Sequence, residues 1–302
     1  MRKSKDPLAI SKSSNVLFNI LLATLAALAV LPFLFVIIIS LTNEDSLAKN
    51  GYSFFPKEWS FDAYRYILTS GSEIMNAYGV SIFVTVVGVI LGLLATALYA
   101  YALSRDEFAY RNFFNMVTII PMFIGGGLVA TYLIMTQFLG LKNSIWALII
   151  PGMINTFHII VMRTFFKTTI PNALIESAKI DGANEWQIFS RIVVPISLPG
   201  LATIALFLTL GYWNDWMHAM LYISKDNLIP LQYLLVRIQN NMDFLNSSGS
   251  SMGMSASVVA NSLPKESARM AIVVITTLPI ACAYPFFQKY FVQGLTVGAV
   301  KE

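Results

Sequence analysis

Long apolar segments are the feature that most limits how this chain can fold. A helix needs about 20 apolar residues to cross the hydrocarbon core of a bilayer, and the run 16–42 alone is longer than that. The chain is 56% hydrophobic and 12% charged, whereas soluble domains carry about 25% charged residues. We therefore predict an all-α, polytopic membrane protein with six transmembrane helices. The predicted spans are 16–42, 78–103, 113–136, 144–162, 201–223 and 269–287.

The polar segments divide the chain into a membrane domain and two short ends. Residues 1–15 are polar and basic. The apolar run after them is too long for a signal-peptide core and lacks a small-residue cleavage site, so we expect an uncleaved membrane helix. Residues 16–290 form the predicted six-span domain, and 291–302 form a tail. The predicted polar loops of the domain are 43–77 and 224–268 on one side and 170–200 on the other.

The distribution of Lys and Arg predicts the side on which each loop lies. Twelve of the 20 basic residues fall in segments on the side of the N-terminus, although those segments are shorter in total than the segments opposite. Cytoplasmic loops of membrane proteins carry the excess of Lys and Arg. We therefore predict a multi-pass protein of the bacterial plasma membrane, with both termini and the segment 170–200 in the cytoplasm.

The segment 170–200 has the local signals of two short helices joined by a tight turn. Asp181-Gly182 predicts the end of the first helix, because Gly tolerates the left-handed backbone of a C-terminal cap. Asn184 and Gln187 have the spacing of a reciprocal capping box at the start of the second helix. We expect Pro195 and Pro199 to end that helix. A helix-turn-helix between two membrane spans is a candidate docking element.

Residues of this segment also match a known pattern. They are Glu176-Ser177-Ala178, then Asp181-Gly182-Ala183, then Phe189, Ile192 and Pro195. The arrangement resembles the EAA loop of importer permeases powered by ATP-binding cassettes, with Ser177 and Val194 in place of the usual Ala and Leu. The likeness continues at 121–123, 213–215 and 288–294. It is similar to the carbohydrate-uptake branch, including the smaller maltose permease subunit, and most of all to the lipoprotein-like permease group.

In that family the loop is a coupling helix that sits in a cleft of the ATPase. The resemblance implies this role for Glu176, Ser177, Ala178, Asp181, Gly182 and Ala183. Small side chains would leave room for a partner's groove, and a Glu near a helix N-terminus also complements the helix dipole. The alternative is a solvated amphipathic hairpin that binds no partner.

The expected partners follow from the same resemblance. The sequence has no phosphate loop of the form Gly-x-x-x-x-Gly-Lys-Ser/Thr, so we expect ATP and Mg to bind a separate ATPase chain and no cofactor to bind here. The family implies a second related permease in a heterodimer, two cytoplasmic ATP-binding-cassette ATPases and an extracytoplasmic sugar-binding protein. The net charge of +4 shows no basic cluster, so nucleic acid is not an expected partner.

The C-terminal tail is a second expected contact with the ATPases. In the family a similar tail inserts between the two ATPase subunits, which implies this role for Gly294, Leu295, Thr296 and Gly298. The alternative is a frayed terminus, because chain ends are often poorly ordered.

Candidate residues for the substrate pathway lie in the predicted spans. Sugars bind aromatic faces and planar polar side chains, and Trp213, Asn214, Asp215 and Trp216 offer both. Asp215 is the only acid within the predicted spans, and an ionisable residue in a span suggests function by default. Asn155 is a weaker candidate. The alternatives are interfacial anchoring by the tryptophans and a helix–helix hydrogen bond for Asp215.

Glycines in two of the spans predict special backbone geometry. Gly79, Gly88 and Gly92 could permit close packing of the second span. The triplet Gly125-Gly126-Gly127 predicts a break in the third span. That break could line the pathway, or it could mark a tight helix crossing.

Two other classes of membrane protein have to be weighed. A secondary transporter or channel without an ATPase normally carries charged relay residues in its spans, and Asp215 stands alone there. An intramembrane enzyme needs paired carboxylates, a nucleophile with its base, or metal ligands at one depth, but His158 and His218 fall on different spans. We therefore predict a non-catalytic permease subunit that imports a carbohydrate, within that class an oligosaccharide, and has no catalytic or metal-binding residues.

Overall fold

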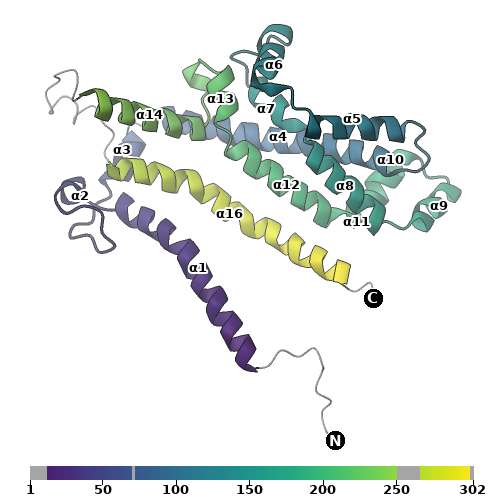
Figure 1. Ribbon diagram of the computed structural model, residues 1–302, viewed down its shortest axis with the longest axis horizontal. Coiled ribbons are helices and arrows are strands. Elements are labelled where there is room, and N and C mark those ends of the chain that lie inside the picture. Colours follow the sequence, from purple (N-terminus) through teal and green to yellow (C-terminus); the bar gives the residue numbers. More distant parts are fainter. Residues whose placement is uncertain (1–11, 70–71, 250–265, 300–302) are drawn as a thin grey trace, which may run out of the picture. The chain divides into compact units, whose positions relative to one another are not determined.

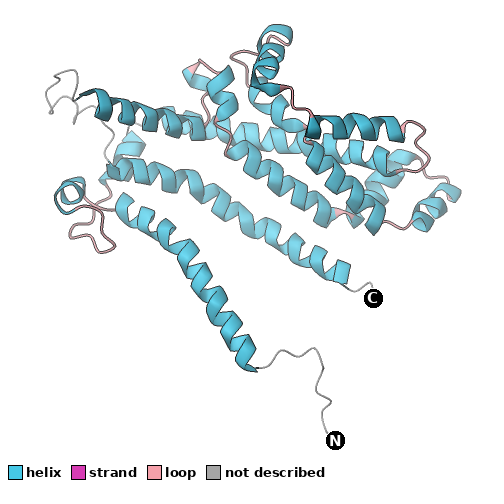
Figure 2. Cartoon of the chain, in the orientation of Figure 1, coloured by secondary structure: helices cyan, strands magenta, loops and turns pink. Residues whose placement is uncertain are grey.

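The computed structural model describes residues 12–69, 72–249 and 266–299 of the 302-residue chain. Within these residues the secondary structure is helical, apart from one isolated bridge between Thr42 and Trp59 (Figure 2). The elements group into two compact units, residues 1–69 with 253–275 and residues 70–252 with 276–302. The prediction of an all-α membrane protein is confirmed.

The first unit contains a long apolar helix, α1 (Lys12–Ser40), whose segment Ser13–Ser40 could cross a membrane. Nearly all of this segment is exposed on the chain itself, as expected for a helix that faces lipid. Two short helices follow, α2 (Glu44–Asn50) and α3 (Asp62–Thr69). Ser60 caps the start of α3, because its Oγ accepts a hydrogen bond from the Asp62 N–H at 3.0 Å.

The helix α2 was not predicted, and it positions the start of the last helix, α16 (Glu266–Ala299). Asn43 caps α2 by accepting hydrogen bonds from two N–H groups of its first turn. The Glu44 carboxylate accepts hydrogen bonds from the N–H groups of Glu266 and Ser267 at 3.0 and 3.1 Å. A loop helix of the first unit therefore caps the N-terminus of α16.

The second unit is organised around the central helix α4 (Ser72–Ser104). This helix packs mainly against α12 (Leu198–Trp213), α8 (Thr156–Thr169) and α7 (Trp146–Met153) (Figure 1). The helices approach closely where the Tyr212 ring lies against Gly88 and Gly152, since a Cβ built there would fall 2.5 and 2.9 Å from the ring. Gly88 and Gly92 thus permit close packing as predicted, whereas Gly79 faces open space.

Three bent pairs of helices can each be counted as one span; two overlap the predicted third and fourth spans, and the other begins within the predicted loop 170–200. The third span consists of α5 (Arg111–Phe123), α6 (Gly127–Leu133) and η1 (Ile134–Phe138), and it bends by 118° at the predicted glycines. The pair α7 and α8 bends by 48°. The pair 185–196 and 198–213 bends by 81°. Counting each pair as one span, the described residues contain six segments able to cross a membrane by length and composition.

One predicted boundary was wrong. The fifth span does not continue to residue 223, because α12 ends at Trp213. The predicted polar loop 224–268 contains a helix in which Leu231 and Leu234 are buried. The elements after Trp213 are α13 (Met217–Tyr222), η3 (Asp226–Leu228) and α14 (Leu231–Gly249).

Candidate functional site

The candidate site is a helical hairpin, residues 171–188, at the end of the second unit where α4 and α8 end. Its first helix is α9 (Asn172–Ile180), which follows Pro171. Gly182 adopts φ +81°, and its N–H donates to the Lys179 carbonyl at 3.0 Å. The predicted helix stop at Asp181-Gly182 is confirmed, because Gly takes this left-handed conformation without steric cost.

The second arm of the hairpin begins with the predicted capping box. Asn184 Oδ1 accepts from the Gln187 N–H at 2.8 Å, and Gln187 Oε1 accepts from the Asn184 N–H at 2.9 Å. The helical chain breaks at Ser197, between Pro195 and Pro199, before the bend into α12. Within the hairpin the second arm is α10 (Glu185–Ile188), which continues beyond the hairpin as η2 (Phe189–Val193) and α11 (Val194–Ile196).

Most of the predicted coupling residues are on the surface of the hairpin. Those that are exposed are Glu176, Ser177, Asp181 and Gly182, and Ala183 is half-buried. Ala178 differs from these residues, because its side chain is only 8% exposed and packs in the core with Ile175. The small Ala178 side chain allows close packing in the core. At Ser177 and Gly182 the small residues leave little side-chain bulk on the exposed surface.

Three large apolar side chains on the hairpin are exposed and were not predicted as part of the site. Ile180 is 86% exposed and Trp186 62%, and Leu174 is also exposed. Ile180 lies directly before the Asp181-Gly182 turn, so the tip of the hairpin exposes an apolar side chain beside an acidic one. Exposed apolar groups of this size, rimmed by polar ones, suit contact with another protein.

A network of ion pairs fastens the hairpin to the loop after α4. Lys179 Nζ contacts the carboxylate of Glu107 and, at 3.1 Å, that of Glu185. The Tyr101 hydroxyl of α4 donates a hydrogen bond to Glu185. The hydrogen bonds to Glu107 and then Glu185 raise the pKa of Lys179 above its ordinary value. Lys179 thus joins both arms of the hairpin to the end of α4.

A second group of charges ties the end of α8 to the same loop. Asp106 pairs with Lys167 of α8 at 3.2 Å and also with Arg111 at the start of α5. Hydrogen bonds from Lys167 and then Arg111 lower the pKa of Asp106 below its ordinary value. The loop between α4 and α5 therefore contacts three other elements of the bundle through side-chain charges.

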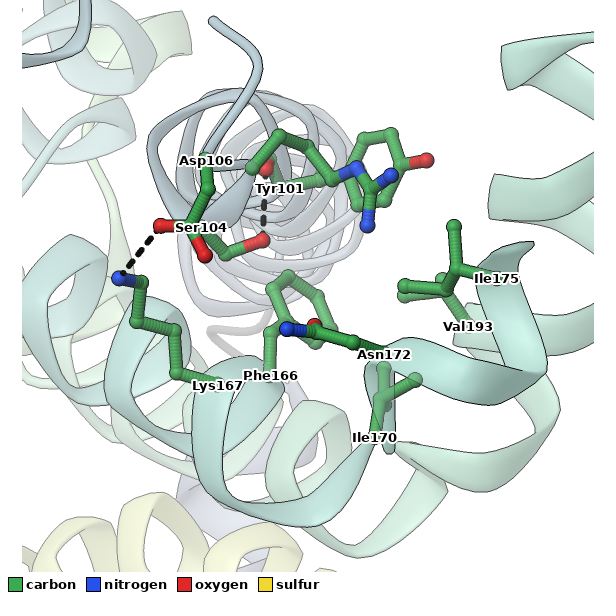
Figure 3. Close-up of a pocket in the computed structure, with 10 residues that line it drawn as sticks. Tyr101, Ser104, Asp106, Phe166, Lys167, Ile170, Asn172, Ile175 and Val193 are labelled. Carbon is green, nitrogen blue, oxygen red and sulfur yellow. Dashed lines mark hydrogen bonds and ion pairs between the residues drawn. The ribbon is translucent and has the colours of Figure 1, made fainter.

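A cavity of about 150 Å³ lies between the ends of α4 and α8, the start of α9 and η2 (Figure 3). We call it the hairpin cavity. In Figure 3, Lys167 and Asp106 lie on one side and Ile175 and Val193 on the other, with Asn172 reaching toward Phe166. Arg105 also lines the cavity.

The opposite end of the second unit contains the sequence-predicted pathway residues. The Trp213 indole is buried, and its Nε1–H donates to the Thr276 carbonyl at 2.9 Å, so it packs the bundle. Asp215 was predicted inside a span but lies between α12 and α13. Its carboxylate accepts from the His218 N–H at 3.1 Å and contacts the His218 ring. Trp216 is 37% exposed.

Two more candidates are polar groups at helix ends. Asn214 caps α12, and its Nδ2 donates to the Leu210 carbonyl at 2.9 Å. Asn155 caps α8 by accepting from the Phe157 N–H at 2.9 Å, and it lies exposed at the bend between α7 and α8. Both side chains keep polar atoms on the surface.

The predicted tail contact involves Gly294, Leu295, Thr296 and Gly298. The backbone of these residues belongs to α16, and their surroundings lie outside what the structure describes. Across residues 12–69, 72–249 and 266–299, no three or more His, Cys, Asp or Glu side chains gather as a metal site would require.

Comparison with known proteins relates the whole chain to one group. A family model described as "Binding-protein-dependent transport system inner membrane component" matches residues 88–297, which include the hairpin. Protein LplC of Bacillus subtilis (strain 168) is 40% identical over 288 residues, which cover 95% of this chain and 93% of LplC. The polygalacturonan/rhamnogalacturonan transport system permease protein YtcP of the same organism is 39% identical and covers 95% of this chain and 99% of its own.

A solved structure gives the same relation at the level of the fold. It is described as a bacterial ABC transporter involved in the import of the acidic polysaccharide alginate. One of its chains matches with a TM-score of 0.79 and 28% sequence identity, over 94% of this chain and 99% of that one.

Proposed function

Since the chain belongs to the family of inner membrane components of binding-protein-dependent transport systems, we propose how its structure serves that transport. The protein is a permease subunit of a carbohydrate importer in the bacterial plasma membrane. Subunits of this family work with a partner permease, an ATPase and a substrate-binding protein. We propose that two ATPases and a heterodimeric partner permease assemble with this chain.

The hairpin is the proposed contact with the ATPase. The observation that carries this proposal is that the tip of the hairpin is exposed, whereas its base is held by ion pairs and by buried side chains. Ile180 and Gly182 are exposed at the tip, whereas Ile175 and Ala178 anchor α9 in the core. A lever must expose one face to its motor and fix the other to the part that moves. Displacement of the tip would pass through Lys179 to the loop after α4 and so to the central helix.

The orientation of the chain follows from this proposal, with the hairpin and both termini in the cytoplasm. A labelling experiment on intact cells tests it. Cys282 is the only cysteine of the chain, so Cys282→Ser gives a background for single cysteines. A membrane-impermeant maleimide should label Lys225→Cys and leave Ile180→Cys unlabelled until the cells are opened. Labelling of Ile180→Cys on intact cells would refute the proposed orientation.

The proposed substrate is an oligosaccharide. The descriptions of two similar transport proteins name polymers of acidic sugars, polygalacturonan and alginate. Fragments of such polymers are therefore the first candidate substrates. Binding and uptake across a panel of uronic-acid and neutral oligosaccharides of matched length would decide the class. A preference for neutral oligomers or for monosaccharides would contradict the respective part of this proposal.

Direct contact with the sugar is proposed for the polar and aromatic groups opposite the hairpin, namely Trp216, Asp215, Asn214 and, at the bend, Asn155. The buried Trp213 supports them by packing. Asp215→Asn keeps the acceptor for the His218 N–H but removes the charge. If Asp215 contacts substrate, this variant should raise KM for uptake while the protein remains equally stable. An unchanged KM would remove Asp215 from the pathway.

The rival function is a secondary transporter or channel that needs no ATPase. Reconstitution separates the two. Vesicles that contain this chain with its permease partner, its ATPases and the binding protein should take up sugar only when ATP is present on the side of the ATPases. The permease chains alone should not transport, and uptake by them down an ion gradient would overturn the proposed mechanism.

A further inference from the structure

The hairpin cavity is lined by a largely buried cation, Arg105, whose Nε–H makes no hydrogen bond within the described residues. The Arg105 side chain is only 14% exposed, and its nearest carboxylate oxygens belong to Glu107 at 3.9 Å and Glu185 at 4.0 Å. The Nε atom itself is buried. A charged donor left without an acceptor in the interior is costly, so an anion in the cavity would relieve that cost.

A second cation faces the same cavity from another helix. Lys167 of α8 lines it together with Arg105, and Asp106 is the one acidic residue in the lining. Asp106 is already paired with Arg111 as well as with Lys167, so its negative charge is largely offset from outside the lining. When the lining residues are counted together with their ion-pair partners, four cations meet three carboxylates, so the group carries one excess positive charge.

Two further features of the cavity suit a phosphate group. Asn172 provides an amide at the start of α9, and no side chain caps that helix end, so the positive end of its dipole faces the same region. The volume of about 150 Å³ is that of roughly five water molecules at about 30 Å³ each, enough for a phosphate group with ordered water. Arg is suited to bind such a group through its forked donors.

We propose that the hairpin cavity binds a phosphate group, supplied by an anionic phospholipid headgroup or by a free phosphate. The cavity lies at the ends of two membrane helices, α4 and α8, where headgroups lie, and basic pockets between membrane helices on the cytoplasmic side bind such lipids. Its assignment to the cytoplasmic leaflet rests on the proposed function. A bound phosphate would join α4, α8 and α9 at the base of the hairpin and stiffen the lever.

The test measures binding rather than uptake, so its failure is distinct from failure of the transport proposal. The assembled transporter is purified and exposed either to phosphatidylglycerol or to inorganic phosphate. Native mass spectrometry counts retained lipid, and calorimetry measures phosphate affinity. We expect saturable binding that Arg105→Gln weakens roughly tenfold. Lys142→Gln is the matched control, because it removes one exposed positive charge at the opposite end of the second unit, outside the cavity lining.

The outcomes distinguish the two sources of phosphate. Lipid that inorganic phosphate cannot displace supports the headgroup, and saturable binding of inorganic phosphate supports a free ligand. If Arg105→Gln fails to assemble, Lys167→Gln gives the same comparison. Absence of binding by both probes, or equal loss of binding in the Lys142→Gln control, would overturn the proposal.

Discussion

The two ends of the second unit are fastened by different kinds of interaction. At the hairpin end, the contacts between separate elements are largely between charged side chains, as in Lys179 with Glu107 and Lys167 with Asp106. At the opposite end, backbone groups take part. Asn143 Oδ1 accepts from the N–H groups of Ser224 and Lys225, and the Asn143 N–H donates to the Tyr222 carbonyl at 2.9 Å.

This difference suggests that the hairpin end can move, whereas the opposite end keeps its position relative to the rest of the second unit. Ion pairs between exposed side chains contribute about 0–1 kcal/mol each, and long side chains can follow a displaced partner. Hydrogen bonds to backbone groups fix the chain itself. Aromatic stacking adds to the fixed end, where Tyr222 lies between Tyr132 and His218. Movement driven from the hairpin should therefore pivot about the opposite end.

The largest expected effect comes from a residue added at the tip of the hairpin. Gly182→Asp should reduce uptake by roughly a hundredfold, because a left-handed position strains an L-residue by about 1–3 kcal/mol and a new carboxylate would face the ATPase beside Asp181. Gly140→Asp is the matched control. Both glycines have positive φ and open space around Cβ, but Gly140 lies at the opposite end. Equal loss of uptake in both variants would show that strain alone explains the effect.

A smaller effect is expected when the base of the hairpin is unfastened. Lys179→Met should lower uptake roughly fivefold, because it removes two ion pairs that together hold about 1 kcal/mol, while ATP hydrolysis continues. Lys179→Arg should retain uptake, since Arg also reaches both carboxylates. Lys142→Met, which alters a lysine at the opposite end, is the control. Proportional loss of ATP hydrolysis and uptake would contradict a role in coupling.

The local structure of the hairpin could be predicted from sequence because short-range signals determine it. The turn requires only a positive φ at Gly182, and the capping box requires only hydrogen bonds between Asn184 and Gln187, three positions later. The fastening could not be predicted, because Lys179 and Glu107 are 72 residues apart and the pair depends on how α4 meets α9. The burial of Ala178 has the same cause, since its helix face is selected by tertiary packing.

The opposite end was predicted less well because hydropathy does not show where a helix stops. Apolar residues continue beyond Trp213, which led to a predicted span up to residue 223. In the structure, Asn214 bonds back to the Leu210 carbonyl and Asp215 accepts from the His218 N–H. Such side chains compete with helical hydrogen bonds and favour turns. The same two residues that suggested a pathway thus also end the helix.

At the fixed end, loss of one side chain should affect stability more than transport. Asn143→Ala should lower the free energy of unfolding by about 1–2 kcal/mol, because it removes an acceptor for two N–H groups and places Ala at φ 59°. Asn143→Asp keeps the acceptor and should behave like the parent. Thermal unfolding of the purified transporter measures both. Loss of uptake without loss of stability would mean that this end also moves during transport.

The smallest expected effect is a response of the hairpin base to pH. The lowered pKa of Asp106 means that its ion pairs are fully present above its ordinary pKa and are lost as pH falls through the lowered value. The raised pKa of Lys179 means that its pairs persist below its ordinary pKa and are lost as pH rises through the raised value. A spin label on Ile180→Cys should therefore give the same line shape from about pH 5 to pH 9. A change within that pH window would show that a titrating group outside these ion pairs holds the base of the hairpin. The difference between the two ends of the second unit would then depend on residues other than Asp106 and Lys179.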